Sequence, residues 1–169
     1  MGKDFRGTDG PLAGELDGSG IRLGIVCARW NDAVTSRLLR GATERADVLG
    51  ITDADVDVAW VPGAFELPLA AQAMAQTGRY DAVVALGCVI RGDTAHFEYV
   101  AGPAAEGIMR AQLDSGVPVV LGVLTTEDRR QALVRSVLPE EELSGDNKGT
   151  EAVDVAVEMV RLLHSIAAG

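Results

Sequence analysis

Apolar and polar positions along the chain follow two different periods. Short, almost continuously apolar runs are typical of buried parallel strands, and they span residues 21–27, 82–86 and 119–124. A further strand is predicted over residues 56–61, which alternate at their start and are closed by Pro62. Elsewhere apolar residues recur every three to four positions, which predicts amphipathic helices over residues 33–49, 65–76, 96–109, 128–137 and from 148 onward. This alternation predicts an α/β fold, a flavodoxin-like three-layer sandwich whose four-stranded parallel sheet is flanked by helices on both faces.

The stretch of residues 81–100 carries the strongest local signal of a ligand site. An apolar strand leads into a glycine-bearing turn with Gly87 and Gly92, and a helix follows from His96. Because the first N–H groups of a helix are unpaired and lie at the positive end of its dipole, we expect this turn to bind an anion such as phosphate. His96 could transfer protons there, although a lone histidine is often only a surface residue.

Residues that follow the other strands belong to the same candidate site, because ligands of open parallel sheets bind at the carboxyl ends of the strands. Trp30 comes just after the first strand and could either stack on a planar ligand or pack beneath the next helix. Glu66 follows the second strand together with Phe65, and it is either a ligand for polar groups or simply a carboxylate at a helix start. Leu121, in the last strand, falls near this edge too.

Composition narrows the classes of function. With 169 residues, we expect a flexible N-terminal arm over residues 1–20 and a single folded domain over 21–169. The net charge of -10, with no local basic cluster, argues against a nucleic-acid partner, and no apolar run is long enough to span a membrane. Cys27 and Cys88 are too few for a disulfide scaffold or a zinc site, so we expect buried thiols, no metal and a cytoplasmic setting.

Five blocks of sequence, in order along the chain, carry a resemblance to a known family. They are RWN at 29–31, VPGAFELP at 61–68, ALGCVIRGDTAHFEYV at 85–100, GVLTTED with QALVR at 122–135, and NKGTEA at 147–152. Together they resemble the 6,7-dimethyl-8-ribityllumazine synthases, transferases of riboflavin biosynthesis. The resemblance implies a condensation without a cofactor, in which 5-amino-6-(D-ribitylamino)uracil and 3,4-dihydroxy-2-butanone 4-phosphate give 6,7-dimethyl-8-ribityllumazine, water and phosphate.

The resemblance also implies a role for each residue of the candidate site. His96 would move protons and Arg135 would bind the phosphate, with Lys148 and Glu151 as supporting charges, unless these last two form only an ion pair at a helix start. The remaining positions would bind the two substrates directly. Gly92, Asp93 and Thr94 would complete the phosphate cradle, and Trp30, Ala64, Phe65, Glu66, Cys88, Val89, Ile90 and Leu121 would bind the pyrimidine and its ribityl chain.

Assembly is a further implication of the resemblance. In this family the site lies between subunits of a cyclic homopentamer, and some members assemble pentamers into hollow shells. Extensive apolar faces on the third and last predicted helices independently predict an oligomer. The acidic insertion PEEELSGD at residues 139–146 is expected to repel its copies near shell contacts, so we expect isolated pentamers, single or in pairs, and not shells.

Three other interpretations remain open at this point. The chain could be an inactive relative that carries a flavin or a lumazine, but such a carrier needs neither His96 nor Arg135. It could be a scaffold that assembles without turnover. A phosphoacceptor receiver domain is disfavoured, because the first and third strands end on Cys27 and Gly87 rather than on carboxylates.

Overall fold

The structure, a computed structural model, describes residues 16–169 of the chain. Strands and helices alternate along it as the hydrophobic pattern predicts. In chain order the elements are β1 (Leu23–Ala28), α1 (Asp32–Val48), the 3-10 turn η1 (Asp53–Asp55), β2 (Val56–Val61), the 3-10 turn η2 (Ala64–Glu66), α2 (Leu67–Gln76), β3 (Ala82–Ile90), α3 (His96–Ser115), β4 (Val119–Thr126), α4 (Arg129–Leu133) and α5 (Lys148–Ala168).

The strands form one parallel sheet in the order β2-β1-β3-β4. At its centre, Leu23 of β1 lies opposite Val56 of β2 on one side and opposite Ala82 of β3 on the other. All six residues of β1 are buried, as a near-continuous apolar run predicts for a strand covered on both faces. All carboxyl ends of the strands therefore meet at one edge of the sheet.

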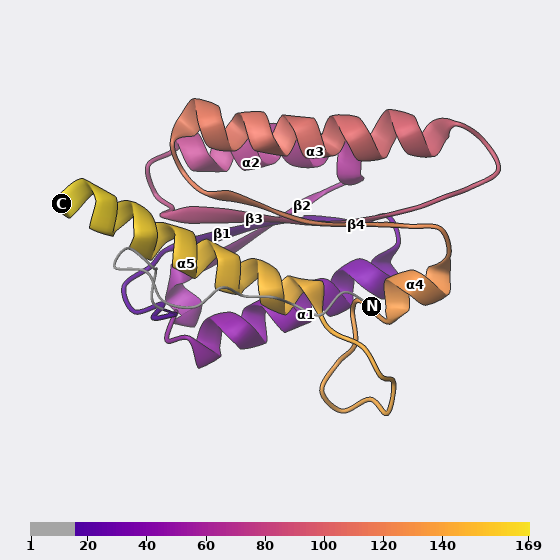
Figure 1. The fold of residues 1–169 in the computed structure, drawn as a ribbon, viewed down its shortest axis with the longest axis horizontal. Helices are drawn as coiled ribbons and strands as arrows, with labels where there is room; N and C mark the ends of the chain where they lie inside the picture. The colour runs from indigo at the N-terminus through magenta and orange to yellow at the C-terminus, as the bar shows by residue number, and fades with distance from the viewer. Residues whose placement is uncertain (1–15) are drawn as a thin grey trace.

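Two layers of helices sandwich the sheet, with α2 and α3 on one face and α1 and α5 on the other (Figure 1). Each face has its own apolar core. Leu38 of α1 and Val153 of α5 belong to the first core, and Leu67 of α2 and Ile108 of α3 belong to the second. The three-layer α/β fold expected from the sequence is therefore confirmed.

The third strand runs further than its apolar run predicts. Gly87, expected in a turn, lies inside β3, which continues to Ile90 and pairs there with Thr126 of β4. A Cβ on Gly87 would lie 2.9 Å from Leu67 Cδ1, so the glycine allows α2 to approach the sheet closely. The expectation of a turn at this glycine was wrong because close packing, and not chain reversal, requires it.

The predicted helix over residues 128–137 is also shorter than expected. Only Arg129–Leu133 is helical, and the chain then enters a segment that projects beside α1 (orange in Figure 1). The N-cap of α4 is Asp128, whose carboxylate accepts the Gln131 N–H at 2.7 Å. The helix predicted over residues 65–76 is also divided: its first residues belong to the 3-10 turn η2, and the α-helix α2 starts at Leu67.

Most of the arm expected over residues 1–20 lies outside the described residues. At the first described residues, the Gly18 N–H donates to Leu49 O at 2.8 Å. Arg161 of α5 donates to the carbonyl oxygens of Asp17 and Ser19, each at 2.7 Å.

Among the helices of residues 16–169, none combines the length and apolar content that a membrane crossing requires.

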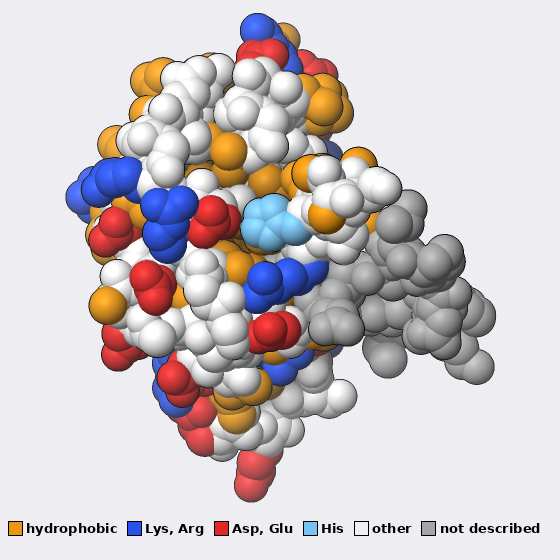
Figure 2. Space-filling view, turned by 90° about the vertical axis from the view of Figure 1, so that its left-hand side faces the viewer, with side chains coloured by type: hydrophobic (Ala, Val, Ile, Leu, Met, Phe, Trp, Pro, Cys, Tyr) orange, Lys and Arg blue, Asp and Glu red, His pale blue; other side chains and the backbone are white. Residues whose placement is uncertain are grey.

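The surface at one end of the molecule mixes charges of both signs. Figure 2 views the left-hand end of Figure 1, where basic and acidic side chains alternate over the described residues without forming a continuous basic patch. Among the described residues, an ion pair joins Arg22, just before β1, to Asp81, just before β3, at 3.2 Å.

Candidate functional site

Trp30 lies on the turn after β1, at the carboxyl edge of the sheet. Its backbone N–H donates to Pro62 O at 3.1 Å. A Cβ on Gly63 would lie only 3.0 Å from the Cε3 atom of the Trp30 indole. The absence of a side chain on Gly63 therefore lets the indole contact the backbone that follows β2. Because the indole is 66% exposed, it is not packed beneath α1, and it offers an aromatic face to a planar ligand.

Asn31 is a site residue that the sequence analysis missed. It is the N-cap of α1 with φ 61°, in the left-handed region that asparagine tolerates better than most residues. Its side chain makes no capping hydrogen bond, and instead Nδ2 donates to Cys88 O at 2.8 Å. Asn31 thus ties the turn that carries Trp30 to the end of β3.

The 3-10 turn η2 supplies the second side of the site. Ala64 is buried, whereas the ring of Phe65 is 58% exposed at the same edge as Trp30. Glu66 Oε2 accepts the Gly63 N–H at 3.0 Å, so the carboxylate does cap a helical start. Its other oxygen is the one that a ligand hydroxyl could reach.

The end of β3 forms a backbone surface between these two sides. The pairing of β3 with β1 stops at Leu86, whereas its pairing with β4 continues to Ile90. On the β1 side, residues 88–90 therefore lie beyond the ladder, and the Cys88 carbonyl there is the one bound by Asn31. Burial raises the pKa of the Cys88 thiol to about 11, so this thiol is neutral near pH 7 and acts as an apolar group.

The turn between β3 and α3 exposes Gly92, Asp93 and Thr94. Thr94 Oγ1 accepts the His96 N–H at 3.4 Å, and the imidazole of His96, the first residue of α3, is exposed beside the turn. Twenty residues of helix follow, so unpaired N–H groups and a full helix dipole face the turn. Unpaired N–H groups at the start of a helix favour an anion, and anion binding by residues 92–94 stays a prediction.

Arg91 holds this turn in place, and the sequence analysis did not single it out. Its guanidinium pairs with Glu98 of α3 and, at 2.8 Å, with Glu127 after β4. It also lies 4.1 Å from the centroid of the Phe97 ring, within the range of a cation–π contact. The two carboxylates neutralise Arg91, so its charge is engaged in fixing the turn.

The remaining predicted residues line a separate cavity. Leu121, Arg135, Lys148 and Glu151 surround about 320 Å³ between β4, the end of α4 and the start of α5. Arg135 Nη1 donates to Gln131 O at 3.0 Å. Since none of the residues on the turns after β1, β2 and β3 lines this cavity, one copy of the chain presents the candidate site as two groups.

Lys148 forms the ion pair that the sequence left as an alternative. Its Nζ lies 2.8 Å from carboxylate oxygens of both Asp146 and Glu151. Partial burial acts to lower the pKa of Lys148, but the two carboxylates outweigh it and hold the pKa above its usual value. The lysine is therefore protonated at neutral pH, and its charge is already neutralised within the chain.

Over residues 16–169, no group of three or more His, Cys, Asp or Glu side chains is placed to hold a metal ion.

Comparison with known proteins bears on this arrangement. A family model described as 6,7-dimethyl-8-ribityllumazine synthase matches residues 20–164, which include every residue of both groups. Among solved structures, "T. thermophilus RuvC in complex with Holliday junction substrate" matches with a TM-score of 0.26 and 16% identity over 62% of this chain and 67% of that chain.

Proposed function

The chain belongs to the 6,7-dimethyl-8-ribityllumazine synthase family, and from this premise we propose that it condenses 5-amino-6-(D-ribitylamino)uracil with 3,4-dihydroxy-2-butanone 4-phosphate. The family acts on small molecules in riboflavin biosynthesis. In the proposed reaction an amine attacks the ketone to give an imine with loss of one water, phosphate is eliminated, and ring closure with loss of a second water yields the lumazine. The free thiols of Cys27 and Cys88 fit a reducing, cytoplasmic compartment.

The observation that carries the proposal is the arrangement around the end of β3. Residues 88–90 extend past the last paired residue of β1, so on that side their backbone groups, apart from the Cys88 carbonyl that Asn31 binds, lie outside the ladder and are available to a uracil edge. Trp30 and Phe65 present exposed rings at the same edge. Glu66 accepts from the ribityl hydroxyls. A heterocycle with a polyol chain fits this combination of flat apolar faces, backbone groups and one carboxylate.

The phosphate ester binds next to this surface, at the start of α3. Backbone N–H groups of residues 92–94 and the helix dipole stabilise its negative charge. The exposed imidazole of His96 is adjacent and exchanges protons during imine formation and elimination. Holding both reactants in contact supplies a large part of the rate enhancement, since amine and ketone are intrinsically reactive.

The second group of residues completes the site from a neighbouring copy. We place Arg135 on the phosphate, with Leu121 closing the pyrimidine side and Lys148 and Glu151 as supporting charges. Three observations favour a shared site: β4, which carries Leu121, is an edge strand; Leu121 is 51% exposed; and α3 exposes the large apolar side chains of Tyr99, Met109 and Leu113. A cyclic homopentamer, with a single catalytic domain per chain, buries such faces.

Steady-state absorbance of the lumazine, with both substrates and purified protein, tests the activity. A protein that binds a lumazine but forms none would be a carrier, and the proposal would be wrong.

Mixing two variants tests the shared site. His96→Ala and Arg135→Ala are unfolded together, refolded as a mixture and assayed below the wild-type KM for the butanone phosphate. If the two residues come from different copies, about one site in four regains both of them in a random assembly, and activity rises above that of either variant alone. If both residues serve the site of their own copy, the mixture gains nothing.

A further inference from the structure

The two basic residues of the second group flank one closed loop. Arg135 precedes it and Lys148 follows it, and the Lys148 N–H donates to Arg135 O at 2.9 Å. Ser136 and Asn147 form an isolated antiparallel bridge at the base of the loop. The spacing of the two cations therefore depends on whatever fixes this base.

Helix α1 provides that support through Arg37. Its Nε donates to Ser136 O at 2.9 Å, on the residue that follows Arg135. The same guanidinium pairs with Glu141, whose carboxylate also accepts the Leu138 N–H at 2.9 Å. The Arg37 side chain is only 19% exposed. Such a half-buried fork that serves a carbonyl and a carboxylate at once has a single geometry.

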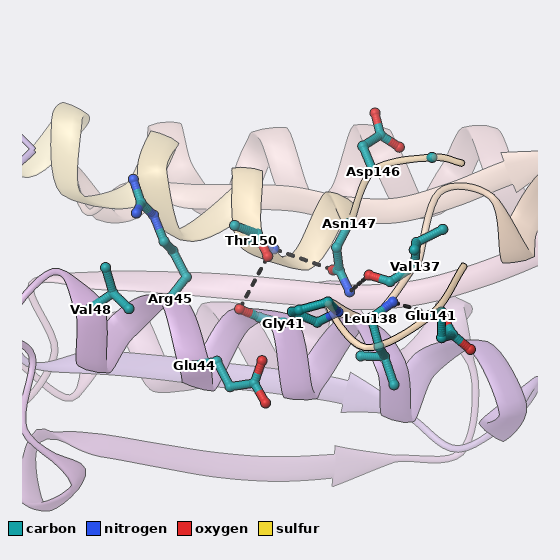
Figure 3. A pocket seen from close by; sticks show the side chains of 12 residues that line it. Gly41, Glu44, Arg45, Val48, Val137, Leu138, Glu141, Asp146, Asn147 and Thr150 are labelled. Carbon is teal, nitrogen blue, oxygen red and sulfur yellow. Dashed lines mark hydrogen bonds between the residues drawn. The ribbon is translucent and has the colours of Figure 1, made fainter. Parts of the chain in front are cut away.

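Asn147 supports the other side of the base. Its Nδ2 donates to Arg37 O and to Val137 O, each at 3.1 Å, while its Oδ1 accepts the Gly149 N–H at 2.9 Å at the start of α5. Figure 3 shows the amide between α1, the loop and the first turn of α5. A Cβ on Gly41 would lie 2.5 Å from this side chain, so a glycine is needed for the close approach.

We propose that Arg37 and Asn147 are positioning residues, which hold Arg135 and Lys148 at the spacing that a phosphate ester requires. Neither side chain touches the substrate. The inference rests on the proposed function, in which Arg135 binds the phosphate. It follows from the contacts. Arg37 bonds to the backbone carbonyl of Ser136, the residue next to Arg135. Asn147 is itself the residue next to Lys148. Fork recognition of a phosphate by arginine depends on direction, so movement of this backbone weakens it.

Two variants and one matched control test the proposal. Arg37→Ala removes the support of Ser136, and Asn147→Ser removes the amide donors but keeps a side-chain oxygen that can cap α5. Arg40→Ala is the control, because Arg40 is also on α1 and pairs with Glu140 of the same loop but bonds to no backbone at its base. Steady-state kinetics with each substrate varied, and calorimetric titration with inorganic phosphate, give the readouts.

We expect Arg37→Ala and Asn147→Ser to raise the KM for the butanone phosphate and to weaken inorganic phosphate binding by about ten- to a hundredfold. The KM for the pyrimidine should stay within about twofold of wild type, and Arg40→Ala should change neither constant. Arg37→Lys, which keeps the charge, should recover only part of the loss because it lacks the fork.

Unchanged phosphate affinity in folded Asn147→Ser and Arg37→Lys would overturn the positioning role, and so would an equal loss for both substrates. If the wild-type protein formed no lumazine, the proposed reaction would fail separately, and titration with inorganic phosphate would still decide whether the two supports matter.

Discussion

Replacing Arg135 by alanine is the most direct perturbation of the proposed phosphate site. Among residues 16–169, no carboxylate pairs with this guanidinium, whose Nη1 donates only to Gln131 O at 3.0 Å. Its charge is therefore available to a ligand, unlike that of Lys148, which lies 2.8 Å from Asp146 and from Glu151. A hydrogen bond to a charged group contributes about 1.5–3 kcal/mol. Its loss predicts about 10- to 150-fold weaker binding of the phosphate substrate.

The assay separates the two substrates. Lumazine absorbance is followed while each substrate is varied in turn, and calorimetry measures the affinity for inorganic phosphate. Arg135→Ala should raise the KM for the butanone phosphate, Arg135→Lys should fall between it and wild type, and Lys148→Ala should have the smaller effect. Wild-type phosphate affinity in Arg135→Ala, or a larger loss in Lys148→Ala, would refute the reasoning that the unpaired cation is the clamp.

His96→Ala should reduce turnover by about 10²-fold or less with little change in either KM, because proton transfer is one part of the task; a larger loss in steady-state assays would give the imidazole a further role. Ile25→Ala should lower the free energy of unfolding in urea by about 2–5 kcal/mol, because Ile25 is fully buried in the first core. The Leu138 N–H and Arg37 hold the pKa of Glu141 below its usual value. The contacts of the Glu141 carboxylate with the loop are therefore complete above the ordinary carboxyl pKa and are lost as the pH falls through the lowered one. Amide exchange over residues 137–147, corrected for intrinsic rate, should accelerate on acidification. Glu141→Gln should reduce that dependence, and the part that remains belongs to Glu140, which pairs with Arg40.

The loop also qualifies an expectation about assembly. The acidic insertion over residues 139–146 predicts repulsion between copies and hence isolated pentamers. In the structure, Glu140 and Glu141 pair with Arg40 and Arg37 of α1, so part of this charge is neutralised within the chain. The prediction of isolated pentamers therefore depends on Glu142 and on the bulk of the loop.

Hydrophobic periodicity alone predicted the α/β class, the parallel sheet and its two helical layers. It also predicted the bounds of β2, which ends at Val61, directly before Pro62. These features were predictable because burial on one or both faces imposes a period on the residues of each element. Order along the chain was enough to expect that Trp30, Glu66 and His96 share one edge of the sheet.

Long-range contacts decided the rest. Gly87 lies in a strand because Leu67 packs against it, and Asn31 serves the end of β3 instead of capping its own helix. The bonds from Arg37 to Ser136 and from Asn147 back to Arg37 join parts of the chain about a hundred residues apart. Sequence period reports which face of an element is apolar, but it carries no information about which polar atoms meet across elements. Only tertiary packing brings those atoms within hydrogen-bonding distance, and so only the folded chain determines what holds the two cations of the site in place.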